Sequence, residues 1–251
     1  MQHAGRYAGG TALIILGGMS SNGWQELKEE VKPDVILGGN GVNAVVQDLD
    51  VWACTENMNF TSRRASMGEP RAMEFMEMFY REAGAKVKLI SHRSWNLLKD
   101  TSRCISTRRW GWEADQVPEA FNYREYGEGF NSGWVFSDKR YMRLPQRVGN
   151  VGCQLIHFSA ILGCDQVHTI GLDLMFKDKT RHHFYDYPKY IVDHFRNGPN
   201  FIDYQGVKTQ AIWIQCAKFM ITTEPYLERD GIKWRDHSDG LLKLMGLGCT
   251  K

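Results

Sequence analysis

The sequence lacks the features that mark several specialised classes of protein. Its six cysteines contain no C-x-x-C pair, which argues against a zinc knuckle and against a disulfide framework. The formal net charge is +2, so no global field draws the chain to nucleic acid or to an anionic membrane. The first apolar run, 12–16, is far shorter than the roughly 20 residues that cross a bilayer, and no basic n-region or cleavage site accompanies it. These absences predict a cytoplasmic globular protein without a membrane span.

What the sequence does contain is a series of short apolar runs, each closed by small or polar residues. They end at Leu16, at Gly39-Asn40, at Cys54 and at Ser91, and segments of helical composition at 24–31 and 71–83 lie between them. This alternation is typical of parallel β/α units. We therefore expect a doubly wound, mostly parallel α/β sheet in a single domain, 1–251, with a frayed N-terminal decapeptide.

The ending of the first run is the first candidate for a binding site. Gly17, Gly18, Ser20 and Ser21 follow the run directly, at the edge where open parallel sheets bind ligands. Small residues let a backbone approach a ligand and expose N–H groups to an anion, so the stretch is a candidate phosphate cradle. It is neither G-x-G-x-x-G nor a Walker loop, and a tight structural turn is the alternative reading.

Polar residues also follow the later runs. Asn40 and Asn57 end the second and third runs, where they could bond a base, ribose or phosphate. In the segment 147–176, Gly149-Asn150 is expected to open a helix that Gly163 ends. The buried strand that follows, 167–172, would deliver Asp173 to the same edge of the sheet.

Here the sequence resembles a known superfamily: the bacterial sialyltransferases, with the related motility-associated glycosyltransferases and 6-hydroxymethylpterin diphosphokinases. The resemblance rests on "LGGMSS", on "RVGN" and the "LG" and "GLD" that follow it, and on "GIKWRDHSDGLLKL" near the C-terminus. It implies a Rossmann-like fold of the variant glycosyltransferase-A type. It also implies nucleotide contacts at the first loop, at Asn40 and at Glu56-Asn57, phosphate contacts at Arg147 and Asn150, and a ligand near Ser238.

The resemblance leaves the activity open between two reactions. The first is transfer of a sugar from a nucleotide sugar, similar to a CMP-sugar, to a hydroxyl acceptor, with no obligatory cofactor. Met175 stands where the sialyltransferases carry a donor-binding tyrosine, which argues against sialic acid itself. The alternative is a pyrophosphokinase acting on a hydroxymethylpterin-like substrate, which would need Mg²⁺ with Asp173 as a ligand. A non-catalytic nucleotide-binding module is a third class.

A histidine-rich stretch after this strand supplies the candidate base. His182 and His183 lie in "RHHFYDYP", and a histidine with a pKa of about 6.5 can accept a proton from an acceptor hydroxyl at neutral pH. Tyr185, with Tyr187 and Arg181, could donate hydrogen bonds to the departing phosphate. The alternative is an aromatic loop that packs on the sheet. Histidine and aspartate here, and the D-x-D at 48–50, are also metal-ligand types, but 48–50 precedes a strand and is expected to be a turn.

Residues 93–147 break the pattern of regular elements. They combine four tryptophans with arginines, acidic residues and several glycines, so we expect an irregular lid insertion on the acceptor side. Because the charges of this segment are mixed, a saccharide or small hydroxyl acceptor is favoured over a nucleic-acid acceptor. The stretch 209–220 is expected to be a core helix. A homo-oligomer is left open.

Overall fold

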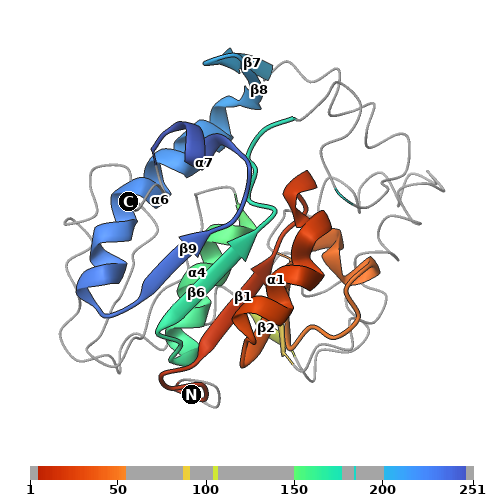
Figure 1. Cartoon of the computed structure of the whole chain (residues 1–251), viewed down its shortest axis with the longest axis vertical. Coiled ribbons are helices and arrows are strands. Elements are labelled where there is room, and N and C mark those ends of the chain that lie inside the picture. The colour runs from red at the N-terminus through yellow and green to blue at the C-terminus, as the bar shows by residue number, and fades with distance from the viewer. Residues whose placement is uncertain are drawn as a thin grey trace.

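The chain folds into a parallel β-sheet covered by helices, as the computed structural model shows for residues 5–54, 87–90, 104–106, 150–176, 184 and 201–246 (Figure 1). The strands of the sheet are β1 (Thr11–Ile15), β2 (Val35–Gly39), β3 (Val51–Cys54), β4 (Val87–Ile90), β5 (Cys104–Ser106), β6 (Gln166–Ile170) and β9 (Lys233–Asp236). The helices are α1 (Trp24–Val31), α4 (Val151–Leu162), α6 (Ala211–Arg229) and α7 (Leu241–Leu244), with the 3-10 helices η1 (Met19–Gly23) and η2 (Asn40–Ala44). A separate antiparallel hairpin consists of β7 (Phe201–Tyr204) and β8 (Val207–Gln210).

The strand order is β5-β4-β3-β2-β1-β6-β9, and each neighbouring pair in this sheet is parallel. The chain begins in the middle of the sheet at β1, proceeds outward to β5, and then returns to place β6 on the other side of β1. The direction of winding therefore reverses between β1 and β6. The expectation of an α/β fold with a parallel sheet is confirmed, and the expected strands correspond to β1, β2, β3, β4 and β6.

Helices cover both faces of the sheet. Ala12, Ile14 and Leu16 share a buried cluster with the side chains of α4, whereas the alternate residues Leu13 and Ile15 point to the opposite face. Figure 1 shows α1 on the near face and α4 on the far face. This two-sided burial explains why the central strands read as continuous apolar runs rather than as alternating ones.

The ends of α4 are determined by its flanking residues, as the sequence predicts. The Asn150 side-chain oxygen accepts a hydrogen bond from Gly152 N at 2.6 Å, which caps the helix. Gly163 ends the helix in the left-handed conformation, with φ of 97°.

The expected fraying of the N-terminal decapeptide is wrong for its second half. Gly5 N and Tyr7 N donate to the carbonyl oxygens of the last turn of α4, at 3.0 and 2.8 Å, because those carbonyls have no partner within the helix.

The remaining expectations are tested only in part. The core helix expected at 209–220 begins at Ala211 and continues to Arg229, through Pro225. The helix expected at 71–83 and all of the lid except β5 lie outside the described residues. In the part of the chain that the structure describes, no helix combines the length and apolar character needed to cross a membrane.

Candidate functional site

The candidate site lies beyond the carboxyl ends of β1 and β6, where the winding of the sheet reverses. The loops that follow these two strands remain side by side. Leu16 N donates to the Ile170 carbonyl oxygen at 2.9 Å, and Gly18 N donates to the Gly171 carbonyl oxygen at 2.9 Å. Reversal points of this kind leave a crevice between neighbouring loops in open α/β sheets, and they are the usual position of a ligand.

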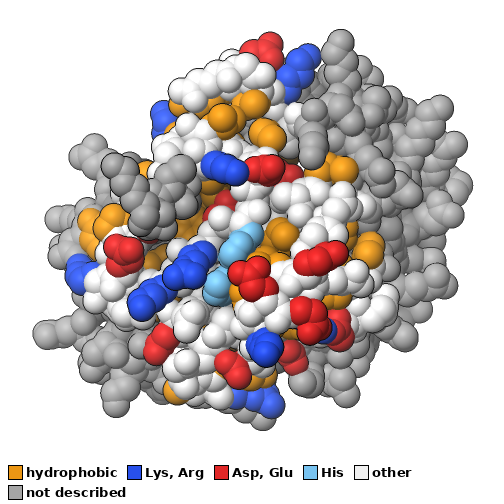
Figure 2. Space-filling view, viewed as in Figure 1, with side chains coloured by type: hydrophobic (Ala, Val, Ile, Leu, Met, Phe, Trp, Pro, Cys, Tyr) orange, Lys and Arg blue, Asp and Glu red, His pale blue; other side chains and the backbone are white. Residues whose placement is uncertain are grey.

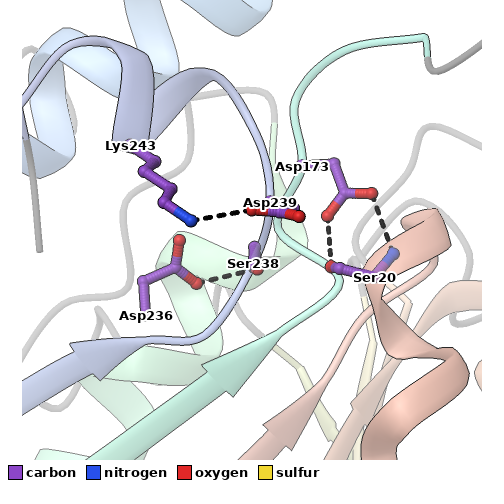
Figure 3. Close-up of polar contacts among 6 residues, drawn as sticks. All are labelled: Ser20, Asp173, Asp236, Ser238, Asp239 and Lys243. Atoms are coloured by element: carbon purple, nitrogen blue, oxygen red, sulfur yellow. Dashed lines mark hydrogen bonds and ion pairs between the residues drawn. The ribbon is translucent and has the colours of Figure 1, made fainter.

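Asp173 joins the two loops through its carboxylate (Figure 3). The side chain is 5% exposed, and it accepts hydrogen bonds from Ser20 N, at 3.1 Å, and from the Ser20 hydroxyl. The same hydroxyl accepts a hydrogen bond from Gly171 N at 3.0 Å. Asp173 therefore lies where the sequence predicts it, at the sheet edge beside the first loop.

Two glycines make room for Asp173. A Cβ atom on Gly18 would lie 2.6 Å from Asp173 Cγ, and one on Gly240 would lie 2.1 Å from the Asp173 carbonyl oxygen. Both distances are far below van der Waals contact. Three segments that are distant in the sequence therefore meet at Asp173: the loop after β1 contacts its carboxylate, and the segment before α7 contacts its backbone.

A second carboxylate, Asp236, lies at the end of the adjacent strand β9. Its Oδ1 atom accepts a hydrogen bond from the Thr169 hydroxyl at 2.7 Å. The same atom accepts one from the Ser238 hydroxyl at 2.8 Å (Figure 3). Ser238 in turn accepts a hydrogen bond from Leu172 N at 2.7 Å, and Trp234 Nε1 donates to the Thr169 hydroxyl at 3.0 Å. Ser238 thus reaches the site, but its hydroxyl is engaged within the protein.

Burial raises the pKa of Asp236 from its ordinary value of 3.8 to about 6, and the negative charge of Asp173 adds to this shift. The hydrogen bonds from Thr169 and Ser238 act in the opposite direction, because they stabilise the charged form. A carboxyl group with a pKa of about 6 can both accept and donate a proton near neutral pH. The site therefore holds one carboxylate fixed by a serine and a second that is suited to proton transfer.

The first turn of α4 borders the same edge. A Cβ atom on Gly39 would lie 2.6 Å from Val151 Cγ1, so the end of β2 approaches the helix closely. Asn40, which follows, has a positive φ of 54°, a conformation that asparagine tolerates better than most residues. Asn150 lies at this edge as expected, although its side-chain oxygen serves as the helix cap.

The first loop does not expose its N–H groups as the phosphate-cradle hypothesis requires. Gly18 N, Ser20 N and Ser21 N donate to Gly171, to Asp173 and to Gly18, all within the protein. The Ser21 hydroxyl is fully buried and donates to the Leu16 carbonyl oxygen at 2.7 Å. A carboxylate of the protein itself occupies the position in which the sequence suggested an anionic ligand.

Several predicted site residues lie outside the described residues. They are Glu56, Asn57, Arg147, Gly149, His182, His183 and Tyr185. Phe184, which directly follows His183, is described, and its N–H donates to the Gly17 carbonyl oxygen at 3.0 Å. Phe184 itself therefore contacts the first loop.

Asp236 is the functional candidate that the sequence analysis missed. The resemblance directed attention to Ser238, two residues later. The rule that identified Asp173, a carboxylate at the carboxyl end of an apolar strand, applies equally to Asp236 at the end of β9. That rule could have found it, although the short strand contains only one hydrophobic side chain, Trp234.

A separate polar cluster lies on the near face of the sheet. His168 Nδ1 and His237 Nε2 are 2.9 Å apart, and the ring centroids are separated by 5.1 Å. Burial lowers the pKa of His168 to about 4; the charges of His237 and Arg235 contribute, whereas Glu30 opposes the shift. Figure 2 shows histidine side chains between basic and acidic groups on this face. Because His168 lies within β6, this pair is distinct from the edge site.

The described residues contain no group of three or more His, Cys, Asp or Glu side chains arranged to hold a metal ion. The acids at 48–50 have partners within the protein, because Asp48 forms an ion pair with Lys28 and Asp50 accepts from Ile36 N. The segment is irregular, with a bend at Asp50, rather than the expected turn. Comparisons of the chain with family models, with curated proteins and with solved structures give no significant match.

Proposed function

We propose that this protein is a glycosyltransferase of Rossmann-like, variant glycosyltransferase-A type that binds a nucleotide sugar at the carboxyl edge of its sheet. The observation that carries the proposal is the hydrogen bond between Phe184 N and the Gly17 carbonyl oxygen. It places Phe184, the residue that directly follows His183 in the sequence, against the loop after the central strand. Chemistry and binding would then share one edge of the fold.

The nucleotide phosphate would lie at the N-terminus of α4 rather than on the first loop. The first turn of a helix presents N–H groups that lack partners within the helix, together with the positive end of the helix dipole. Gly39 and Gly152 leave room there for the side chains of Val151 and Leu16, so the ends of β1 and β2 pack directly against this turn. Arg147 and Gly149 immediately precede this turn in the sequence, and Arg147 would add a charged donor. Asn40 would contact the base or ribose.

Proton transfer from the acceptor hydroxyl needs a base that titrates near neutrality. His183 or His182 is the first choice, with Tyr185 and Arg147 stabilising the departing phosphate. Asp236 is a second choice, because its raised pKa gives it the same competence. Replacement of the true base by an isosteric or small residue should lower kcat by about 10²-fold or more and leave nucleotide affinity nearly unchanged.

A Mg²⁺-dependent pyrophosphokinase is the second candidate, and the position of Asp173 favours it. The carboxylate repels a phosphate bound directly to the first loop, whereas a divalent cation held by Asp173 would attract one. Mg²⁺ commonly uses one or two carboxylates and completes its shell with water and substrate phosphates. Asp173 alone would satisfy this pattern, although both of its oxygens now bind Ser20.

Thermal-shift measurements separate these functions. The full chain is titrated with CMP, UDP, GDP and ATP, each with and without Mg²⁺; a ligand at 100 times its Kd stabilises by about 2.7 kcal/mol. Stabilisation by CMP or UDP without metal supports the glycosyltransferase. Stabilisation by ATP only with Mg²⁺, lost in Asp173→Asn, supports the pyrophosphokinase instead. The absence of any shift at millimolar ligand would remove the nucleotide from both proposals.

An activity comparison distinguishes an enzyme from a binding module. Once a stabilising nucleotide is known, sugar release from the corresponding donor is measured for the unaltered protein, for His183→Ala and for Asp236→Asn. Loss of turnover in one variant, with the thermal shift retained, identifies the base. A protein that binds the nucleotide but releases no sugar or pyrophosphate with any acceptor hydroxyl tested is a binding module.

A further inference from the structure

Two buried cysteines meet between α4 and α6. The Sγ atoms of Cys153, in the first turn of α4, and Cys216, in α6, are 3.2 Å apart, and both residues are fully buried. One turn further along each helix, the rings of His157 and Phe219 are in contact, with their centroids 6.2 Å apart. The two helices therefore run alongside each other over this stretch. Cys164, just after the end of α4, is a third buried cysteine of the described part of the chain.

We propose that Cys153 and Cys216 form an intramolecular disulfide under oxidising conditions, and that this bond ties α4 to α6. A disulfide has an S–S length of about 2.05 Å, so the sulfur atoms need to approach by only about 1.1 Å. Helix packing tolerates shifts of this size. The two cysteines are 63 positions apart in the chain, so the bond closes a long loop that the reduced chain leaves open.

The folded protein itself protects the reduced pair. Burial raises the pKa of Cys153, and the neighbouring Cys216 raises it further, so the Cys153 thiol is held in the unreactive protonated form. Oxidation therefore takes place while α4 and α6 are apart, during folding or a local opening. A small disulfide such as oxidised glutathione is the oxidant. The thiolate of one cysteine attacks it, which forms a mixed disulfide and releases one glutathione. The thiolate of the second cysteine attacks the mixed disulfide and releases the second glutathione, and the two released glutathione thiolates take up the two protons that the cysteines lost.

The bond would join the two elements that build the carboxyl edge of the sheet. The first turn of α4 touches the end of β1, because a Cβ on Gly152 would lie 2.6 Å from Leu16 Cδ1. Helix α6 leads directly into β9, which ends at Asp236. The disulfide would thus link α4, which borders the candidate site, to α6, which leads into the strand that carries the second carboxylate of the site. This inference does not depend on the proposed function.

The test is a refolding experiment on the full chain. The reduced, denatured protein is refolded across a series of glutathione buffers from fully reduced to fully oxidised. Each sample is quenched with acid, unfolded in denaturant, alkylated and digested for mass mapping. We expect a cross-linked pair of peptides containing Cys153 and Cys216, two hydrogen atoms lighter than the reduced pair, whereas Cys164 is alkylated. Alkylation of both Cys153 and Cys216 in the folded fraction at every buffer ratio overturns the proposal, as does their preferential pairing with other cysteines.

Stability supplies the second measurement. Closure of a loop of this length restricts the unfolded chain, so the melting temperature of the oxidised form should exceed that of the reduced form by roughly 5–10 °C. Cys164→Ser, the matched control, should retain both the cross-link and this difference, and Cys216→Ser should lose both. If Cys216→Ser does not fold, the mapping of the unaltered chain decides alone. Equal melting temperatures of a mapped, fully cross-linked sample and its reduced form overturn the stabilising role.

Discussion

Carboxylates lie both where the strands of this sheet begin, the amino edge, and where the strands end, the carboxyl edge. The environments at these two edges differ. At the amino edge, Asp34 is exposed and accepts from Thr11 N at 2.8 Å, while Asp50 is half-buried and accepts from Ile36 N at 3.0 Å. At the carboxyl edge, Asp173 is buried, and Asp236 is half-buried with a pKa raised to about 6. Both carboxyl-edge groups bind serine hydroxyls rather than the first N–H groups of strands.

The difference shows what each edge requires. The strands at the amino edge begin with N–H groups that need an acceptor, and a solvated carboxylate provides one at little cost. The carboxyl edge brings two acidic groups into electrostatic contact in a poorly solvated place, which opposes stability. A carboxyl group whose pKa is raised as strongly as that of Asp236 is a candidate for binding or catalysis, because such groups cluster at functional sites. The comparison therefore separates structural acids from candidate functional ones.

The largest effect is expected from overfilling the carboxyl edge at Gly171. This glycine has φ of 81°, and a Cβ there would lie 2.0 Å from the Ser21 hydroxyl oxygen and 2.4 Å from the Leu16 carbonyl oxygen. Gly171→Ala should lower the free energy of unfolding by about 3–5 kcal/mol. Gly231→Ala is the matched control, because Gly231 has φ of 80° but open space around it, and it should cost only about 1–2 kcal/mol. Urea unfolding of both variants measures the difference, and equal losses would show that the edge is not tightly packed.

A smaller loss is expected from neutralising Asp173. An asparagine can accept only one of the two hydrogen bonds from Ser20, so Asp173→Asn should lower the free energy of unfolding by about 2 kcal/mol. Asp50→Asn at the amino edge retains its single acceptor oxygen and should change it by less than about 0.5 kcal/mol. Denaturant titrations at pH 7 provide the comparison. An Asp50→Asn variant as unstable as Asp173→Asn would remove the distinction between the edges.

Neutralising Asp236 should instead stabilise the protein, by about 1–2 kcal/mol at pH 8. The folded pKa is raised above the ordinary value of 3.8, so this group favours folding fully below about pH 4, and the contribution is lost as the pH rises through about 6. An asparagine oxygen can still accept from Thr169 and Ser238, but it carries no charge. Unfolding free energies of Asp236→Asn and the unaltered protein at pH 4 and pH 8 test this, and a gain that is equal at both pH values would contradict the raised pKa.

The smallest effect is expected from the histidine pair. The folded pKa of His168 is lowered from 6.5 to about 4, so its contribution to stability is present above pH 6.5 and is lost as the pH falls toward 4. Because the partner ring of His237 is exposed to solvent, the loss should be only about 1 kcal/mol. In His168→Gln, the melting temperature should fall less between pH 7 and pH 4.5 than it does in the unaltered protein. An equal fall in both proteins would show that other groups cause the loss of stability in acid.

The sequence was sufficient for the framework of the fold but not for the interior of the site. Short apolar runs, the Asn150 cap and the Gly163 terminator each act within a few residues, so β1, β2, β6 and α4 could be predicted locally. The bond between Ser20 and Asp173 joins residues 153 positions apart. No local pattern says whether a small-residue loop faces a ligand or a carboxylate of its own chain, and the contact of Cys153 with Cys216 was unpredictable for the same reason.

The position of β1 in the middle of the sheet has a consequence for synthesis on the ribosome. β1 is the first strand to emerge, but its partner on one side, β6, ends at Ile170, about 155 residues later. At a translation rate of about 5–20 residues per second, the side of β1 that pairs with β6 remains without its native partner for roughly 10–30 s. During that interval its free N–H and C=O groups can pair with another nascent chain, so slower translation or crowded polysomes should increase aggregation of this protein.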